Sequence, residues 1–322
     1  MDASPGFDCI YVSPSTGVHD ARWFSALTSL GHRPHHVPRD AFPGGEDFIA
    51  HIAHAASGGI PVIAGPLEIA EMLNASVDKL IFLSWGFDLQ EAAPNTDLSS
   101  FHAVIIDSHA NEEIAQGFGA TRTVLIPWGV DLRTLTSDKR VADLTAYGIS
   151  ADEPVALSLR AHEELYRVAD IIEAFARAPL HARLVIGNTG SLTPHLQQLA
   201  RDLGVDAVFL PPVDESDVPA LLRRASVCVT ASQVDGTSVT LLQAMACGTP
   251  IAASANAGNL EWIEDGVTGF LFPIAGIDAL GSALERAIAE GSAVTHAALA
   301  QVTKRADWQQ NITKLDSLLT QL

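Results

Sequence analysis

The stretch that most restricts how this chain can fold is residues 226–273, where apolar segments alternate with short polar turns. A buried strand is predicted at Val227–Val229, and the polar turn after it contains Asp235-Gly236. A helix then runs to Gly248-Thr249-Pro250, where a glycine followed by a proline ends it, and a second apolar strand begins at Ile251. A strand, a helix and a strand with such short joints predict a parallel βαβ unit.

The turn after the first of these strands has the features of a site for phosphate or sugar oxygens. The helix is expected to open near Thr237-Ser238, just beyond Asp235. Backbone N–H groups without helical partners and the positive end of the helix dipole therefore lie at this turn. Such an arrangement suits a phosphate group or a sugar hydroxyl. The stretch thus predicts a ligand site at the carboxyl end of the strand.

Longer-range spacing in the same stretch carries a family resemblance. Seven residues separate Asp235 from Gln243, and the chain continues as Ala-Met-Ala-Cys-Gly-Thr-Pro over residues 244–250 and as Gly-Asn-Leu-Glu over residues 258–261. This order resembles the nucleotide-sugar site of the retaining family 4 glycosyltransferases, with Asp235 and Gln243 standing where that family has glutamate. The resemblance implies the GT-B fold, an α/β architecture of two Rossmann-like domains that face an interdomain cleft, with a C-terminal helix returning to the first domain.

The rest of the chain repeats the alternation of apolar strands and amphipathic helices on both sides of a polar connecting segment, 132–152. The opening strand at 7–13 is not followed by Gly-x-Gly-x-x-Gly, which disfavours a dinucleotide cofactor. We expect an N-terminal Rossmann-like acceptor domain at 1–134, a C-terminal nucleotide-sugar domain at 135–300, and a terminal helix at 301–322 that packs back on the first domain.

The charge and hydropathy of the chain limit its partners. The net charge is −19, and a surface so acidic repels nucleic acid and anionic lipid. No apolar run approaches the roughly 20 residues that a membrane-spanning helix needs. A Lys/Arg-rich amphipathic helix and a secretory signal are both missing from the pattern. We therefore expect a cytoplasmic protein that binds neither nucleic acid nor membranes and acts on a soluble acceptor.

Two groups of candidate residues follow strands of the first domain. Gly17 lies in the first strand–helix turn, where the resemblance implies a glycine that lets acceptor and donor phosphate approach the backbone. His19 and Asp20 stand beside it as acceptor-side candidates, although Asp20 can equally cap the helix while His19 is solvated. Trp85 and Asp88 follow a later strand. Trp85 is a stacking platform for a sugar, a lid, or a packed core residue.

The second domain supplies the candidates for the donor diphosphate. Negative charge grows on the diphosphate as the sugar leaves, so fixed positive charge and N–H dipoles aimed at it lower the barrier. Arg160 follows a buried strand and matches the family's arginine, and its guanidinium fork suits phosphate. A helix is predicted from about Glu164 to Ala178. Within it, Tyr166 stands at the position of the family's lysine, with Arg167 next to it. Arg160, Arg167 and Asp235 are therefore the catalytic candidates.

Further donor-binding candidates lie after Asp235. The resemblance implies that Asp235 holds sugar hydroxyls, although Asp-Gly is also a plain turn signal. Gln243 is eight residues on, about two helical turns, which predicts that it lies on roughly the same face as Asp235. The resemblance implies that the residue at this position contacts the ribose. The donor-binding candidates of this stretch are Gly236, Thr237, Ser238, Val239 and Gln243.

Together these features predict a retaining glycosyltransferase that moves a sugar from a nucleoside diphosphate sugar, of UDP or GDP type, to a small-molecule or glycan hydroxyl. In the front-face mechanism that the resemblance implies, the leaving phosphate oxygen takes the acceptor's proton. No Asp-x-Asp follows a strand, so neither a metal nor a resident cofactor is expected. Two alternatives stay open: a GT-B protein that binds a sugar nucleotide or a partner without catalysis, and an isomerase such as a sugar-nucleotide 2-epimerase.

Overall fold

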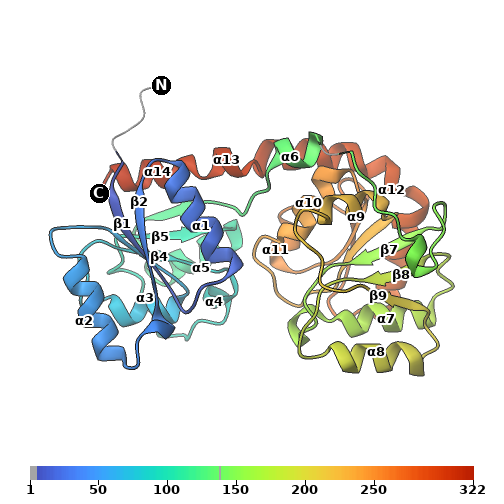
Figure 1. The fold of residues 1–322 in the computed structure, drawn as a ribbon, viewed down its shortest axis with the longest axis horizontal. Helices are drawn as coiled ribbons and strands as arrows, with labels where there is room; N and C mark the ends of the chain where they lie inside the picture. Colours follow the sequence, from blue (N-terminus) through green and yellow to red (C-terminus); the bar gives the residue numbers. More distant parts are fainter. Residues whose placement is uncertain (1–5, 138) are drawn as a thin grey trace. The chain divides into compact units, whose positions relative to one another are not determined.

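A computed structural model describes residues 6–137 and 139–322, and the packing of the backbone divides the chain into two units (Figure 1). Unit 1 comprises Met1–Pro127 together with Gln309–Leu322, and unit 2 comprises Trp128–Trp308. Each unit is built from alternating strands and helices, so the chain has two doubly wound α/β halves. No helix in the described ranges is long and apolar enough to cross a membrane.

In the described part of unit 1, six parallel strands form one sheet in the order β2-β1-β3-β4-β5-β6. The strands are β1 (Asp8–Ser13), β2 (Arg33–Pro38), β3 (Val62–Ala64), β4 (Leu80–Leu83), β5 (Ala103–Ile106) and β6 (Thr123–Leu125). The α-helices before the boundary are α1 (Val18–Ser29), α2 (Gly45–Ala55), α3 (Leu67–Leu73), α4 (Phe87–Gln90) and α5 (His109–Gly117). Strands β3, β4 and β5 are apolar along their whole length because helices cover both faces of the sheet.

The last residues of the chain complete unit 1. Helix α14 (Thr313–Thr320) buries Leu315, Leu318 and Leu319. Lys314 Nζ donates a hydrogen bond of 2.8 Å to the carbonyl oxygen of Leu125 at the end of β6, and Asp316 Oδ1 lies 3.3 Å from Nε2 of the buried His32. The C-terminal helix therefore returns to the first half of the chain.

In the described part of unit 2, six parallel strands lie in the order β12-β11-β10-β7-β8-β9. The strands are β7 (Val155–Ser158), β8 (Arg183–Ile186), β9 (Ala207–Phe209), β10 (Val227–Thr230), β11 (Ile251–Ser254) and β12 (Phe270–Phe272). The α-helices are α6 (Leu132–Ser137), α7 (Val168–Arg177), α8 (Thr193–Asp202), α9 (Val218–Arg224), α10 (Val239–Cys247), α11 (Ala257–Leu260), α12 (Ile277–Arg305) and α13 (Trp308–Asn311), which spans the boundary.

The core of unit 2 lies on both faces of its sheet. Leu157 and Val185 belong to one apolar cluster, whereas their neighbours Ala156 and Ile186 belong to another. Successive residues of a strand point to opposite faces, so both faces are dry. The polar residues that follow the strands lie at the carboxyl edge of this sheet, where ligands of parallel sheets bind.

The boundaries between the units fall at 127/128 and 308/309, whereas the sequence predicted 134/135 and 300/301. The backbone N–H of Val130 donates to Ala306 O at 2.8 Å, and that of Trp308 donates to Val130 O at 3.2 Å. The indole rings of Trp128 and Trp308 stack with centroids 5.7 Å apart. These contacts pair the segment after Pro127 with the end of α12, so the segment packs with unit 2.

Candidate functional site

The candidate site of unit 2 begins with Arg160, which follows β7 at the carboxyl edge of the sheet. Its Nη2 lies 2.9 Å from Oδ2 of Asp235, and its Nη1 donates a 2.9 Å hydrogen bond to Oγ of Ser238. The side chains of Arg160 and Asp235 are only 10% and 14% exposed. Residues 75 and 78 positions apart in sequence (235 − 160 and 238 − 160) thus meet around one guanidinium.

Two opposing effects set the charge of Asp235. Burial raises the pKa of its carboxyl above the ordinary value, because desolvation disfavours the charged form. The Arg160 charge and the hydrogen bonds from Arg160 and Ser232 act in the other direction and lower that pKa. The ion pair accordingly holds a carboxylate at the guanidinium that the sequence assigns to the diphosphate.

Residues 232–238 form the 232–238 loop, which leads from β10 to α10. Hydrogen bonds with neighbouring segments of unit 2 hold this loop in place. The carbonyl oxygen of Ser232 accepts from Ser254 Oγ at 2.6 Å and from Asn256 Nδ2 at 3.1 Å. The N–H of Gln233 donates to Leu165 O at 2.8 Å. Ser232, Ser254 and Asn256 are all buried. These contacts fix the backbone that carries Asp235, because a buried polar group that is left without a hydrogen-bond partner destabilises the folded protein.

The loop also depends on a close approach by a glycine in α11. A Cβ built on Gly258 would lie 1.7 Å from Gly236 O and 2.4 Å from Asp235 O. Any side chain at this position would therefore push the two carbonyl groups away. Gly258 belongs to the Gly-Asn-Leu-Glu segment of the sequence pattern, and the structure gives a steric reason for its first residue.

The 232–238 loop leads directly into the N-terminus of α10. Ser238 is the N-cap, and its Oγ accepts a hydrogen bond from Leu241 N at 3.4 Å as well as the one from Arg160. Gly236, Thr237 and Ser238 are buried, and Val239 is the first helical residue. The positive end of the helix dipole thus lies beside the Arg160 guanidinium, which favours an anion at this place.

Tyr166 contacts Arg160 rather than extending the predicted helix. The guanidinium carbon of Arg160 lies 4.2 Å from the centroid of the Tyr166 ring, within the range of a cation–π interaction. A continuous helix over 164–178 was predicted, and that prediction is wrong. The segment forms a 3-10 turn, η3 (Glu164–Tyr166), and then α7, with Arg167 at φ +50° between them.

Arg167 does not join this group. Its Nε and Nη2 donate to the two carboxylate oxygens of Asp170 at 2.8 and 3.1 Å. A bidentate pair of this kind occupies the Nε–Nη2 edge of the guanidinium, one of the two edges at which a phosphate can bind through two hydrogen bonds. Of the two predicted arginines, the structure brings Arg160 to the 232–238 loop and gives Arg167 a partner on its own helix.

Gln243 lies on α10 and is half-buried, and no described residue makes a hydrogen bond to its side chain. The sequence argument that Asp235 and Gln243 share a helix face is wrong, because the helix begins at Val239 and Asp235 belongs to the preceding loop. The two residues are close in sequence, but only Asp235 contacts Arg160.

In unit 1, Gly17 and Asp20 form a helix cap. Oδ2 of Asp20 accepts a 2.8 Å hydrogen bond from Gly17 N, and its Oδ1 accepts one of 3.0 Å from Tyr11 Oη. Asp20 is 3% exposed, whereas His19 is exposed. Of the two readings of Asp20 left open by the sequence, the geometry supports the capping one.

Asp88 is a hydrogen-bond centre in the loop after β4. Its Oδ1 accepts from Ser84 Oγ, Trp85 N and Leu89 N at 2.7, 3.0 and 2.9 Å, and its Oδ2 accepts from Leu67 N at 3.0 Å. Burial raises the pKa of Asp88, and these hydrogen bonds partly offset the shift. Trp85 is half-buried beside this loop. The carboxylate is thus used to fix the starts of α3 and α4.

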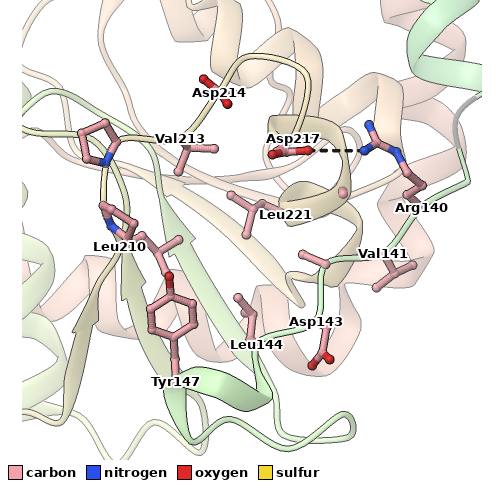
Figure 2. Close-up of a pocket in the computed structure, with 14 residues that line it drawn as sticks. Arg140, Val141, Asp143, Leu144, Tyr147, Leu210, Val213, Asp214, Asp217 and Leu221 are labelled. Carbon is pink, nitrogen blue, oxygen red and sulfur yellow. Dashed lines mark hydrogen bonds and ion pairs between the residues drawn. The ribbon is translucent and has the colours of Figure 1, made fainter.

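The structure also has two clefts, one lined by none of the residues described above and one that includes Asp88. A cleft of about 540 Å³ in unit 2 is lined by Tyr147, Leu210 and Leu221, with Asp214 and the Arg140–Asp217 ion pair at its rim (Figure 2). No sequence-predicted site residue lines it. A cleft of about 510 Å³ in unit 1 includes Asp88 and four further acidic side chains: Glu68, Glu71, Glu91 and Asp97. The lining of the unit 1 cleft has acidic but no basic side chains, and in the unit 2 cleft Arg140 is outnumbered by Asp143, Asp214 and Asp217. Both linings therefore carry net negative charge, which disfavours a diphosphate.

The polar residues beneath the 232–238 loop were not singled out from the sequence. Ser232, Ser254 and Asn256 are small polar residues at or just beyond the carboxyl ends of apolar strands, and that position is the signal that could have identified them. Among the described residues, no three His, Cys, Asp or Glu side chains are close enough together to hold a metal ion.

Comparisons with known proteins find similar sequences for the second half of the chain. A sequence profile described as "Glycosyl transferases group 1" matches residues 142–314. The D-inositol 3-phosphate glycosyltransferase of Geodermatophilus obscurus is 34% identical over 175 residues, which cover 49% of this chain and 39% of that protein. The Mycobacterium tuberculosis protein of the same name is 31% identical over 172 residues, covering 51% and 36%. The alignments thus span less than two fifths of these curated relatives.

Solved structures match the chain over nearly its whole length. Sucrose-phosphate synthase (tll1590) from Thermosynechococcus elongatus superposes with a TM-score of 0.79 at 19% identity, covering 99% of both chains. Anabaena Alr3699/HepE in complex with UDP gives a TM-score of 0.80 at 16% identity, over 98% of this chain and 100% of that one. HepE in complex with UDP-glucose gives 0.79 at 16% identity. This likeness confirms the predicted GT-B fold.

Proposed function

This chain belongs to the glycosyl transferases group 1, and on that premise we propose that it moves a sugar from a nucleoside diphosphate sugar to a hydroxyl acceptor with retention at the anomeric carbon. The observation that carries the proposal is the position of Arg160. Its guanidinium, the hydroxyl of Ser238 and the N-terminus of α10 converge at the carboxyl edge of the unit 2 sheet. A fixed cation and a helix N-terminus aimed at one place stabilise a developing diphosphate anion.

The reaction breaks the bond between the anomeric carbon and a phosphate oxygen, and the electron pair stays on that oxygen. Arg160 and the backbone N–H groups at the start of α10 neutralise the charge as it forms. The acceptor oxygen bonds to the anomeric carbon from the same face, and the departing phosphate oxygen takes the acceptor's proton. Asp235, released from Nη2 of Arg160 by the diphosphate, accepts hydrogen bonds from the sugar hydroxyls.

The similar proteins suggest which substrates to test first. HepE has been crystallised with UDP and with UDP-glucose, so uridine nucleotides come first among donors. Two relatives are named for transfer to D-inositol 3-phosphate, so a phosphorylated polyol comes first among acceptors, followed by neutral sugars and glycans. We propose no metal or resident cofactor for this reaction, since Arg160 and α10 supply the positive charge.

Isothermal titration with UDP, GDP and ADP tests the proposal directly. At least one nucleotide should bind with a Kd below about 1 mM, and Arg160→Ala should weaken that binding about 30-fold or more, since hydrogen bonds between charged groups are the strong ones. The same nucleotide's sugar donors are then screened for release of the diphosphate. Binding of all three nucleotides weaker than millimolar, or unchanged binding in Arg160→Ala, would remove the proposal.

One observation favours a second candidate, a protein that binds a sugar nucleotide without transferring the sugar. Both predicted arginines are paired with carboxylates, Arg160 with Asp235 and Arg167 with Asp170, and the ribose-side residue Gln243 carries no charge. A site whose cations are neutralised stabilises a leaving group less. Tight nucleotide binding with neither donor hydrolysis nor transfer across a panel of donors and acceptors would establish this second candidate.

A further inference from the structure

We propose that Tyr166 is a positioning residue whose ring orients the Arg160 guanidinium toward the diphosphate, in place of making its own contact with the donor. The inference rests on the proposed function and concerns the same site. It changes the role assigned from the sequence, where Tyr166 was a donor-binding candidate at a position that the resembled family fills with lysine.

The guanidinium of Arg160 is held on three sides. Asp235 lies at Nη2, Ser238 accepts from Nη1, and the ring of Tyr166 lies 4.2 Å from the guanidinium carbon. The third guanidinium nitrogen, Nε, is buried and has no hydrogen-bond partner among the described residues. An arginine side chain has many rotamers, so three contacts on different sides are what restrict it to one.

The ring of Tyr166, and not its hydroxyl, makes this contact. No described residue exchanges a hydrogen bond with the Tyr166 hydroxyl, while the ring packs against the apolar cluster that contains Val168 and Ile171. The ring therefore contacts both the apolar core and the Arg160 guanidinium. Because the interaction depends on the ring quadrupole, phenylalanine should replace tyrosine here with little loss.

The local backbone conformation sets the position of the Tyr166 ring next to the 232–238 loop. Tyr166 ends the 3-10 turn η3, and the left-handed conformation of Arg167 at φ +50° stops α7 from extending over it. The carbonyl oxygen of Leu165 accepts from Gln233 N at 2.8 Å, which ties η3 to the 232–238 loop. The ring and the loop that carries Asp235 are consequently one connected structure around Arg160.

The contact between the Tyr166 ring and Arg160 persists when the donor binds. A diphosphate competes with Asp235 for Nη2, so the carboxylate contact is lost at the moment when Arg160 must stay in place. The Tyr166 ring carries no charge and occupies the face of the guanidinium, so an in-plane phosphate does not displace it. The ring thus keeps Arg160 oriented in a site where tyrosine stands at the position of the resembled family's lysine, so that Arg160 is the one cation instead of one of two.

A double-mutant cycle with UDP as the probe tests the inference. Isothermal titration compares the wild type, Tyr166→Phe, Tyr166→Leu and the same two substitutions in an Arg160→Met background; GDP or ADP replaces UDP if the wild type prefers it. We expect Tyr166→Phe to bind within about twofold of the wild type and Tyr166→Leu about 5- to 20-fold more weakly. In the Arg160→Met background, leucine and phenylalanine should bind alike, because the ring acts through Arg160.

A second readout does not require a ligand. The Arg160 Nε–H NMR signal, assigned by its absence in Arg160→Met, should lie upfield in the wild type and in Tyr166→Phe and return toward the ordinary position in Tyr166→Leu. Thermal unfolding of each variant reports folding, and Tyr166→Met, which is close in volume, replaces leucine if that variant does not fold. An Arg160 signal that stays unmoved in the folded leucine or methionine variant would show that the ring does not lie over the guanidinium, which overturns the inference.

The outcomes separate the two proposals. Equal UDP affinity of Tyr166→Leu and the wild type overturns the positioning role alone. A leucine effect that persists without Arg160 shows that the ring touches the donor itself, and a phenylalanine variant as weak as leucine shows that the hydroxyl does; either result overturns the inference. A wild type that binds no nucleotide removes the proposed function and the positioning role with it.

Discussion

Oδ2 of Asp235 lies 2.9 Å from Nη2 of Arg160, and both side chains are mostly buried. The arginine assigned to the diphosphate therefore has its own counter-ion, on the loop that precedes α10. A phosphate oxygen and the Asp235 carboxylate cannot occupy the same side of the guanidinium. The two residues are thus coupled, and the affinity for a diphosphate depends on the carboxylate as much as on the arginine.

Replacing Asp235 by asparagine should separate binding from transfer. Asp235→Asn keeps a carbonyl oxygen for Arg160 but removes the competing charge, so UDP should bind about 3- to 10-fold more tightly. Transfer from UDP-glucose should nevertheless become about 10-fold slower, because the sugar hydroxyls lose a charged acceptor. Titration with UDP and steady-state kinetics with a donor sugar measure the two effects. Unchanged UDP affinity would show that Asp235 does not compete with the diphosphate.

The same pair makes the stability of the protein depend on pH. Burial raises the pKa of Asp235 in the folded protein, so the folded form takes up this proton at a higher pH than the unfolded chain. The contribution of Asp235 to the free energy of unfolding is lowest above the raised pKa and grows as the pH falls through it toward the ordinary value of 3.8.

Wild-type protein should therefore gain stability relative to Asp235→Asn as the pH falls from about 7 to below 3.8, and the gain approaches about 1.4 kcal/mol for each unit by which the pKa is raised. Urea titrations at several pH values measure this difference. Asp88, whose pKa burial also raises, is present in both proteins and cancels from the comparison. A difference that stays constant with pH would mean that Asp235 titrates alike in the folded and unfolded chains.

Arg167 offers a test of which arginine meets the phosphate. It is paired with Asp170 and adopts φ +50°, a conformation that asparagine tolerates. Arg167→Asn should change the Kd for UDP by no more than about threefold, against about 30-fold or more for Arg160→Ala. Isothermal titration of both variants under one set of conditions gives the ratio. Similar losses in the two variants would place Arg167 on the diphosphate as well.

Asp88 is expected to matter for folding. Asp88→Asn replaces one carboxylate oxygen by an NH₂ group, which cannot accept from Leu67 N or from the Ser84–Trp85 side. Leaving such buried donors unpaired should lower the free energy of unfolding by about 2–3 kcal/mol. Chemical denaturation measures this loss, and UDP titration of the folded variant serves as the control. A stable Asp88→Asn protein that has lost transfer to an acceptor would instead assign Asp88 to the acceptor.

Much of the fold could be predicted because it depends on patterns that repeat locally. Apolar runs such as Val227–Val229 and Ile251–Ala253 are buried on both faces. When such runs alternate with helices along a chain, they indicate a parallel sheet that has helices on both sides. The spacing between Asp235 and Gly258 identified the family, and the structural likeness confirmed the fold. The terminal helix was also predicted, whereas the predicted limit at 300/301 falls inside α12, which extends to Arg305 without a glycine or proline to mark its end.

The details of the site could not be predicted because they depend on contacts between distant segments. A sequence pattern of helix type over 164–178 gives no sign of the break at Arg167, which is set by the pairing with Asp170 and by the hydrogen bond between Leu165 and Gln233. In the same way, Asp20 looks alike in sequence whether it caps a helix or binds a ligand. Its hydrogen bonds from Gly17 and Tyr11 distinguish the two roles.

Gly258→Ala should be among the most damaging single-atom changes in unit 2. The added methyl would lie 1.7 Å from Gly236 O and 2.4 Å from Asp235 O, and backbone carbonyls held by the network under the 232–238 loop cannot move aside freely. We expect the free energy of unfolding to fall by about 2–4 kcal/mol and the Kd for UDP to rise more than 10-fold, because the displaced loop carries the acid that faces Arg160. Gly117→Ala, at the end of α5 with nothing within 4 Å of its added methyl, is the matched control and should change neither quantity by much. A Gly258→Ala protein with wild-type nucleotide affinity would show that the position of this loop does not govern donor binding.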